Sequence, residues 1–123
     1  MTPLHIAASN GFEELCKLII NNVKDKNPSS SNWGTTPLHE AASNGHVDVC
    51  KLIMDNIEDK NPPDEDGWTP LHIAAKLGHV DVCKLIANNI EDIDIKNNDG
   101  DTPISLSVHP EIFQFFKTQF YKE

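Results

Sequence analysis

Six histidines and three cysteines are the side chains of this chain best suited to bind a metal ion or attack a substrate. His5, His39 and His72 each follow the residues threonine, proline and leucine, at intervals of 34 and 33 residues. Zinc needs ligands at about 2.0–2.1 Å, whereas equivalent positions on packed helices lie about 10 Å apart. We therefore predict no metal site and no cofactor, and expect each imidazole to tie a helix start to the adjoining loop.

The cysteines show the same long spacing. Cys16, Cys50 and Cys83 are 34 and 33 residues apart, which matches neither a CxxC metal pattern nor a dense disulfide framework. Each lies on an apolar stripe, and Cα atoms more than about 7 Å apart cannot be bridged. We predict buried, reduced thiols. The sequence also lacks a glycine-rich phosphate loop, a GxSxG elbow and an HExxH pair. The chain is therefore not expected to be an enzyme.

These residues belong to a repeated unit. Thr2-Pro3-Leu4-His5 recurs at 36–39 and 69–72, with a degenerate copy at 102–105, and residues 45–53 and 78–86 both read GHVDVCKLI. In the second unit, Thr36 and Pro37 suit the first positions of a helix, and Gly45 suits its end. A second helix is expected from about His46, followed by a turn-rich loop over 59–67. Such helix pairs bury their apolar stripes by stacking as a solenoid.

The opening tetrapeptide, the paired alanines, the Gly-His step and the 33-residue period resemble the ankyrin repeat family along essentially the whole chain. The resemblance implies an all-α solenoid, a single array over 1–123, in which β-hairpin loops join stacked helix-turn-helix repeats. We expect three full repeats at about 1–34, 35–67 and 68–100, and a shortened C-terminal capping repeat at 101–123. A rival interpretation is that Phe116, Phe120 and Tyr121 lie on a helix exposed for a partner.

The exit of the second helix departs from the family pattern, which usually has glycine there. Aligned on Asn61, this chain has Val23, Ile57 and Ile90 at that position. Asn22, Asn56 and Asn89 come one residue earlier, and asparagine tolerates the left-handed conformation better than most residues. We therefore expect these asparagines to take the left-handed role.

The composition limits the chemical class of partner that the chain is expected to bind. The net charge is −9, from 10 basic and 19 acidic residues, which disfavours direct binding to nucleic acid and favours a partner with a basic surface. Simple solubility is the plainer explanation of the acidity. No apolar run approaches a membrane span, and the first residues lack the basic region of a signal peptide. A monomer in the cytoplasm or nucleus is expected.

The family resemblance implies non-enzymatic binding of a partner protein on a concave face made by the hairpin tips and the outward side of each first helix. The alternative is an architectural spacer within a longer array of a multidomain protein. The expected contact residues are Asn32, Trp33, Thr35, Glu40, Ser43, Asn44, Asp64, Glu65, Asp66, Trp68, Lys76, Leu77, Asn98, Asp99 and Asp101. We expect both tryptophans to anchor the partner, although each could instead fold onto its own hairpin.

The resemblance also suggests a modification. Asparagines at the hairpin position of Asn27 and Asn61 are hydroxylated in some ankyrin proteins, and the third repeat carries Asp94 there. The simpler interpretation is a turn asparagine that bonds its own backbone.

Overall fold

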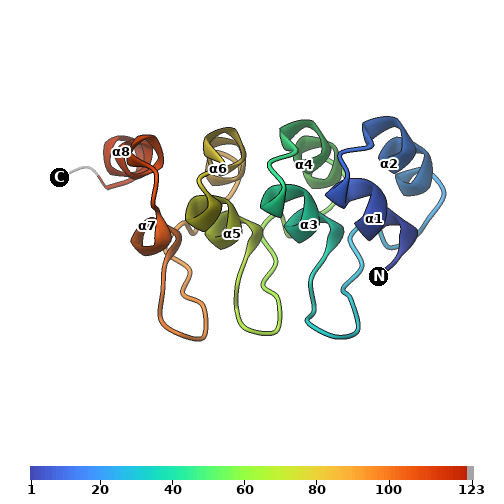
Figure 1. Cartoon of the computed structure of the whole chain (residues 1–123), viewed down its shortest axis with the longest axis horizontal. Helices are drawn as coiled ribbons and strands as arrows, with labels where there is room; N and C mark the ends of the chain where they lie inside the picture. The colour runs from blue at the N-terminus through green and yellow to red at the C-terminus, as the bar shows by residue number, and fades with distance from the viewer. Residues whose placement is uncertain (122–123) are drawn as a thin grey trace.

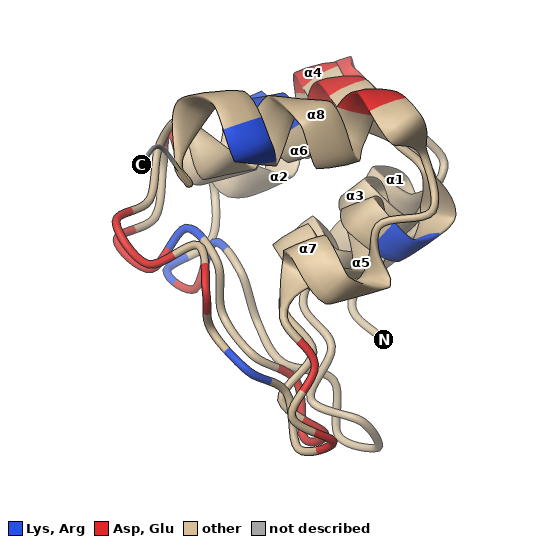
Figure 2. Ribbon diagram, turned by 90° about the vertical axis from the view of Figure 1, so that its left-hand side faces the viewer, with Lys and Arg blue, Asp and Glu red and all other residues tan. Residues whose placement is uncertain are grey.

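The computed structural model describes residues 1–121, which form eight helices in four consecutive pairs. The pairs are α1 (Pro3–Ser9) with α2 (Glu13–Ile20), α3 (Pro37–Ser43) with α4 (Val47–Met54), α5 (Pro70–Leu77) with α6 (Val80–Ala87), and α7 (Pro103–Leu106) with α8 (Pro110–Gln119). Figure 1 shows them side by side along the long axis, with a loop descending between each pair and the next. Seen from the C-terminal end, the first helices, the second helices and the loops occupy three separate regions (Figure 2).

Each first helix starts as its tetrapeptide predicts. The Thr36 hydroxyl accepts from the His39 backbone N–H at 3.3 Å, and His39 Nδ1 accepts from the Thr36 N–H at 3.0 Å. This reciprocal box satisfies two backbone donors that a helix start otherwise leaves unpaired. Pro37 occupies the first helical position, where its missing N–H costs nothing. Gly45 then turns the chain into α4 with a φ of +73°.

The prediction that asparagines take the left-handed conformation at the exit of the second helices is wrong. Among residues 1–121 only glycines have positive φ. Asn22, Asn56 and Asn89 instead donate their side-chain amides to the carbonyl four residues earlier, at 2.7–2.8 Å. In the second repeat the Lys60 ammonium adds bonds to the carbonyls of Met54 and Ile57, at 2.6 and 2.7 Å. Because side chains satisfy the terminal carbonyls, the helix exit needs no left-handed residue.

The loops follow a hairpin path, but no residue between 1 and 121 lies in a β-strand. We call them finger 1 (residues 28–35), finger 2 (62–68) and finger 3 (95–101). In finger 1 the Ser30 N–H donates to the Thr35 carbonyl at 2.7 Å, and equivalent bonds close the other fingers. Fingers 2 and 3 have a second backbone bond, from the N–H of Gly67 and Gly100, at 3.1 and 3.0 Å. The fingers are short, and fingers 1 and 2 begin with proline, which cannot donate to a ladder.

The core is a continuous layer between the pairs, and the main helix contacts lie within a pair or between neighbouring pairs. Small residues allow close packing: Ala41, Ala42 and Cys50 are completely buried. The last first helix is shortened to four residues, as expected from the sequence. Ile112 and Phe116 of α8 are buried against the stack, whereas Phe113 is exposed. Phe116 is therefore core, and the rival interpretation of an exposed helix is wrong for that residue.

Candidate protein-binding face

Buried histidines fix each finger to the preceding first helix, as predicted. The Nε2 atom of His39 lies 2.8 Å from the Trp68 carbonyl oxygen, and His5 and His72 reach Thr35 and Asp101 at 2.8 and 2.9 Å. Because Nδ1 of His39 accepts the Thr36 N–H, Nε2 must carry the proton and donate. Burial lowers the pKa of His39 and of His72, since the charged form loses its hydration. The neutral imidazoles of His39 and His72 thus hold fingers 2 and 3 in place.

The fingers also contact one another. The Glu65 N–H donates to the Trp33 carbonyl at 3.0 Å, and the Asn98 N–H donates to the Asp66 carbonyl at 2.9 Å. Gly67, with a φ of +81°, permits this approach, because a Cβ there would lie 2.9 Å from the Asn98 nitrogen. At Gly100, no atom of residues 1–121 lies within 4 Å of the Cβ position. The three fingers therefore form one connected surface whose outer flank, at finger 3, is open.

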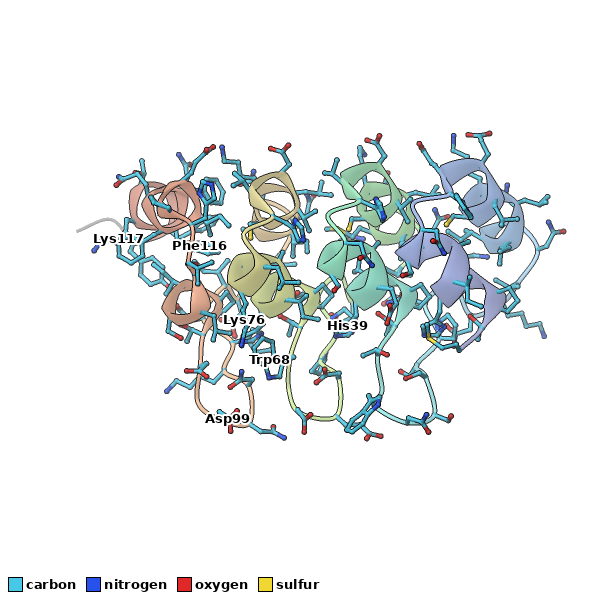
Figure 3. All side chains as sticks on the ribbon, in the orientation of Figure 1. His39, Trp68, Lys76, Asp99, Phe116 and Lys117 are labelled. Carbon is cyan, nitrogen blue, oxygen red and sulfur yellow. The ribbon has the colours of Figure 1, made fainter. Side chains whose placement is uncertain are left out.

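Every one of the predicted contact residues is at least partly exposed. They lie on the fingers and on the first helices α3 and α5, except Asn44, which follows α3 directly. Figures 1 and 3 show the fingers below these helices. The predicted residues thus lie on neighbouring elements of the stack. Their role in binding stays a prediction, because partial exposure alone does not identify an interface.

The two tryptophans differ. Trp33, on finger 1, has an exposed fraction of 66%. Trp68 is half-buried: its ring lies 5.9 Å from the His72 ring, and the Lys76 ammonium lies 5.3 Å from its centroid (Figure 3). A cation over an indole face is attracted by the ring quadrupole. Trp68 therefore packs onto its own repeat, whereas Trp33 offers a free aromatic surface.

Sequence reasoning missed one residue of this face. Ile6 has an exposed fraction of 53%. It occupies the helical position of Glu40 and Ile73, both partly exposed, and lies three residues before Ser9, the equivalent of Lys76. Since Lys76 points toward finger 2, this side of each first helix faces the fingers. The charged residue at the equivalent position 40 was the signal that could have identified Ile6.

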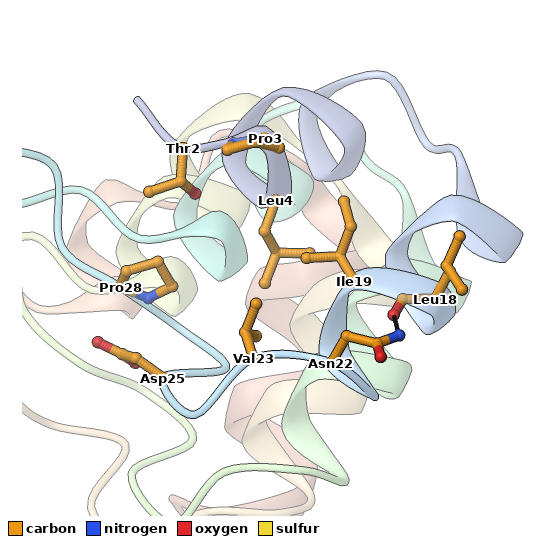
Figure 4. A pocket seen from close by; sticks show the side chains of 9 residues that line it. All are labelled: Thr2, Pro3, Leu4, Leu18, Ile19, Asn22, Val23, Asp25 and Pro28. Carbon is orange, nitrogen blue, oxygen red and sulfur yellow. Dashed lines mark hydrogen bonds between the residues drawn. The ribbon is translucent and has the colours of Figure 1, made fainter.

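An apolar groove of about 540 Å³ lies at the N-terminal end, away from the fingers' tips. Thr2, Pro3, Leu4, Leu18, Ile19, Asn22, Val23, Asp25 and Pro28 line it (Figure 4). Equivalent residues of the next repeat explain the groove: Leu18, which lines it, has an exposed fraction of 61%, whereas the equivalent Leu52 is half-buried against the core. In the second pair, α1 and α2 cover that surface. The groove is thus a stacking surface without a neighbour among residues 1–121.

The candidate hydroxylation sites are held in hydrogen bonds. The side-chain oxygens of Asn27 and Asn61 accept from the backbone N–H of Leu38 and Leu71, at 3.1 and 3.0 Å. Asn61 is buried, and Asn27 is half-buried. These amides fix the start of the next helix, which is a structural role. Their hydroxylation stays a prediction.

The chemistry-bearing side chains are separated or buried. Cys16, Cys50 and Cys83 are free and buried, and burial raises the pKa of Cys50 and Cys83 to about 12. A thiol of that pKa is almost entirely protonated at neutral pH and is a poor nucleophile. Within residues 1–121, no three His, Cys, Asp or Glu side chains gather as metal ligands would. The same residues contain no helix with the length and hydrophobicity needed to cross a bilayer.

Comparison with known proteins agrees with the geometry. The family model described as ankyrin repeats in three copies matches residues 1–64 and 54–119. The chain belongs to the ankyrin repeat family, whose repeats are generally protein–protein interaction modules. A search of curated proteins found no significant match.

Proposed function

We propose that this chain is a non-enzymatic module that binds a partner protein on the face formed by the three fingers and the first helices. The exposed indole of Trp33 carries the proposal, because tryptophan is enriched at interface hot spots and this ring contributes little to its own fold. In this proposal the repeats at 1–34, 35–67 and 68–100 supply the face together with Asp101, and the repeat at 101–123 is the cap. Lys122 and Glu123 lie outside the described residues.

Charge points to a basic partner surface. Fingers 2 and 3 together carry five carboxylates and one lysine, and the whole chain carries −9. Complementary charge raises the association rate and disfavours partners of the wrong sign. The same charge opposes a phosphate backbone, so the proposed partner is a protein and not a nucleic acid. We place this activity in the cytoplasm or nucleus, consistent with three free thiols, and expect the chain to act as a monomer.

Trp33 and Trp68 have different roles in this proposal. Trp33 is the anchor, because its exposed ring can be desolvated by a partner. Trp68 fills the space between finger 2 and α5, and the Lys76 ammonium lies over its ring. Replacing Trp68 is therefore expected to affect folding stability as well as binding.

The test compares affinities for a partner isolated with the wild-type chain. Titration should show that Trp33→Ala weakens binding by about 2 kcal/mol or more, as expected for a hot spot. Phe12→Ala is the matched control, since Phe12 is an exposed aromatic at the start of α2, outside the face. The proposal fails if both variants bind equally well, or if Phe12→Ala alone loses affinity.

The alternative function is an architectural spacer within a longer array. The N-terminal groove favours it, because the equivalent surface of the next pair is covered by a neighbouring repeat. A spacer has no requirement for an exposed Trp33. Loss of partner binding in Trp33→Ala, with unchanged thermal stability, would therefore distinguish the binding module from the spacer.

A further inference from the structure

The three fingers differ systematically in charge. Finger 1 contains no ionisable side chain. Finger 2 contains Asp64, Glu65 and Asp66, and finger 3 contains Lys96, Asp99 and Asp101. Acidic residues mark the finger ends in Figure 2, and Figure 3 places Asp99 at the end of finger 3. The negative charge of the tips is thus confined to the two fingers nearer the C-terminus.

Apolar exposure shows the opposite trend on the fingers. Trp33 is the exposed aromatic of finger 1, and the tryptophan of finger 2 is half-buried beneath Lys76. Ile6 adds exposed apolar surface on α1, at the same end of the array. On the first helices the trend is less strict, since Leu77 of α5 is also exposed. Along the finger tips, however, the surface changes from aromatic and neutral to acidic.

The spacing of these features follows from the finger contacts. The bond from the Glu65 N–H to the Trp33 carbonyl places the first acidic finger directly beside the aromatic one. The bond from Asn98 to Asp66 places finger 3 next. The fingers are carried by the stacked first helices, packed helices lie about 10 Å apart, and an extended chain advances about 3.3 Å per residue. One finger therefore corresponds to about three residues of an extended partner segment.

We propose that the finger tips bind an extended partner segment in which an apolar residue and two basic residues follow one another at intervals of about three. The apolar side chain covers Trp33, and the lysine or arginine side chains pair with the carboxylates of fingers 2 and 3. This inference rests on the proposed function and specifies the order of side chains in the partner.

Lys76 supports the placement of the basic residues at the tips. Its ammonium is held over Trp68 on the inner side of finger 2 and bears the same charge as the incoming side chains. A lysine or arginine that turned inward toward α5 would be repelled there, whereas at Glu65 and Asp66 it meets exposed carboxylates. The face thus has carboxylates at the finger tips, such as Glu65 and Asp66, and the Lys76 ammonium nearer to α5.

Two synthetic peptides of identical composition test the order. The matched peptide carries leucine at position 1 and arginine at positions 4 and 7, with serine and glycine elsewhere. The permuted peptide carries leucine at position 4 between arginines at 1 and 7, so neither binding direction reproduces the order of the face. We expect the matched peptide to bind at least tenfold more tightly by fluorescence polarisation of a labelled peptide.

Variants assign the effect to the fingers. Trp33→Ala should abolish the preference for the matched peptide, and Asp99→Lys should weaken both peptides. Asp81→Lys, on α6 away from the fingers, changes the net charge equally and should leave the preference intact. Equal affinity of the two peptides, or no measurable binding of either, would overturn the inference. The proposed function is judged separately, by titration with the isolated partner, and would survive equal affinity.

Discussion

The buried histidines predict a specific loss of stability on acidification. In the folded chain, Nδ1 of His39 accepts the Thr36 N–H. If Nδ1 were protonated, its N–H would face the Thr36 N–H in a buried site, and this hydrogen bond would be lost. The pKa of His39 and of His72 is lowered from an ordinary value of 6.5. Below about pH 6.5, His39 and His72 therefore bind protons more readily in the unfolded chain than in the folded chain. The contribution of these histidines to the free energy of unfolding is present above about pH 6.5 and is lost as the pH falls toward their folded-state pKa values.

The size of this effect follows from linkage. Each proton bound only by the unfolded state changes the free energy of unfolding by about 1.4 kcal/mol per pH unit. Even if both histidines stay neutral in the folded chain, they lower the free energy of unfolding by at most about 2 kcal/mol between pH 6.5 and 5.5, because the unfolded imidazoles are only half protonated at pH 6.5. That is a substantial part of the roughly 5–15 kcal/mol typical of a domain. Urea unfolding followed by circular dichroism, at several pH values from 7.5 to 5.5, measures the slope.

A pair of variants isolates the contribution of His39. His39→Ser should keep the helix cap, because Ser105 fills the same position and accepts the Thr102 N–H at 2.9 Å. The slope of its stability against pH should become shallower, by at most one proton. Ile53→Val, a buried change that leaves every histidine in place, should lower stability at all pH values without altering the slope. An unchanged slope in His39→Ser, or constant wild-type stability from pH 6.5 to 5.5, would refute the reasoning.

Three further predictions concern packing. Cys50→Ser should lower the free energy of unfolding by about 1–3 kcal/mol, measured by urea denaturation, because a hydroxyl replaces a fully buried thiol; rapid alkylation of the native thiols would show that they are not buried. Gly67→Ala and Gly100→Ala impose similar strain at φ values of +81° and +83°, but only the former meets a neighbouring finger, so it should show the larger drop in melting temperature. Equal drops would mean that the fingers separate easily. Phe116→Ala should cost about 3–5 kcal/mol and the exposed Phe113→Ala much less, and comparable losses in calorimetry would argue against α8 as a cap.

The features that sequence predicted well are local. Thr36, Pro37 and His39 complete their helix cap within four residues, so the tetrapeptide alone determines it. The period then predicts which units stack, and therefore that the cysteines are buried. The predicted left-handed backbone at Asn56 did not form, because its side-chain amide bonds to the Leu52 carbonyl instead. Asparagine favours both arrangements, so its residue type alone does not determine which one forms.

The tryptophans show what sequence could not settle. Both belong to fingers, and both suit an interface. In repeat register, however, Trp33 corresponds to Asp66, whereas Trp68 corresponds to Thr35. Only the structure shows that the latter position lies within reach of the His72 ring and the Lys76 ammonium. Exposure of an aromatic side chain depends on such neighbours from other elements, which the residue type does not reveal.

Because the segments Gly45–Ile53 and Gly78–Ile86 are identical, one whole repeat can be removed without a new junction. Deleting residues 46–78, 33 in all, joins Gly45 to His79 and leaves the segment GHVDVCKLI intact. In the shortened chain His39 would meet the Asp101 carbonyl in place of that of Trp68, and finger 1 would adjoin finger 3. The reverse insertion would add a finger by the same route. The length of the surface can thus evolve in whole repeats, while each bond type between neighbours is conserved.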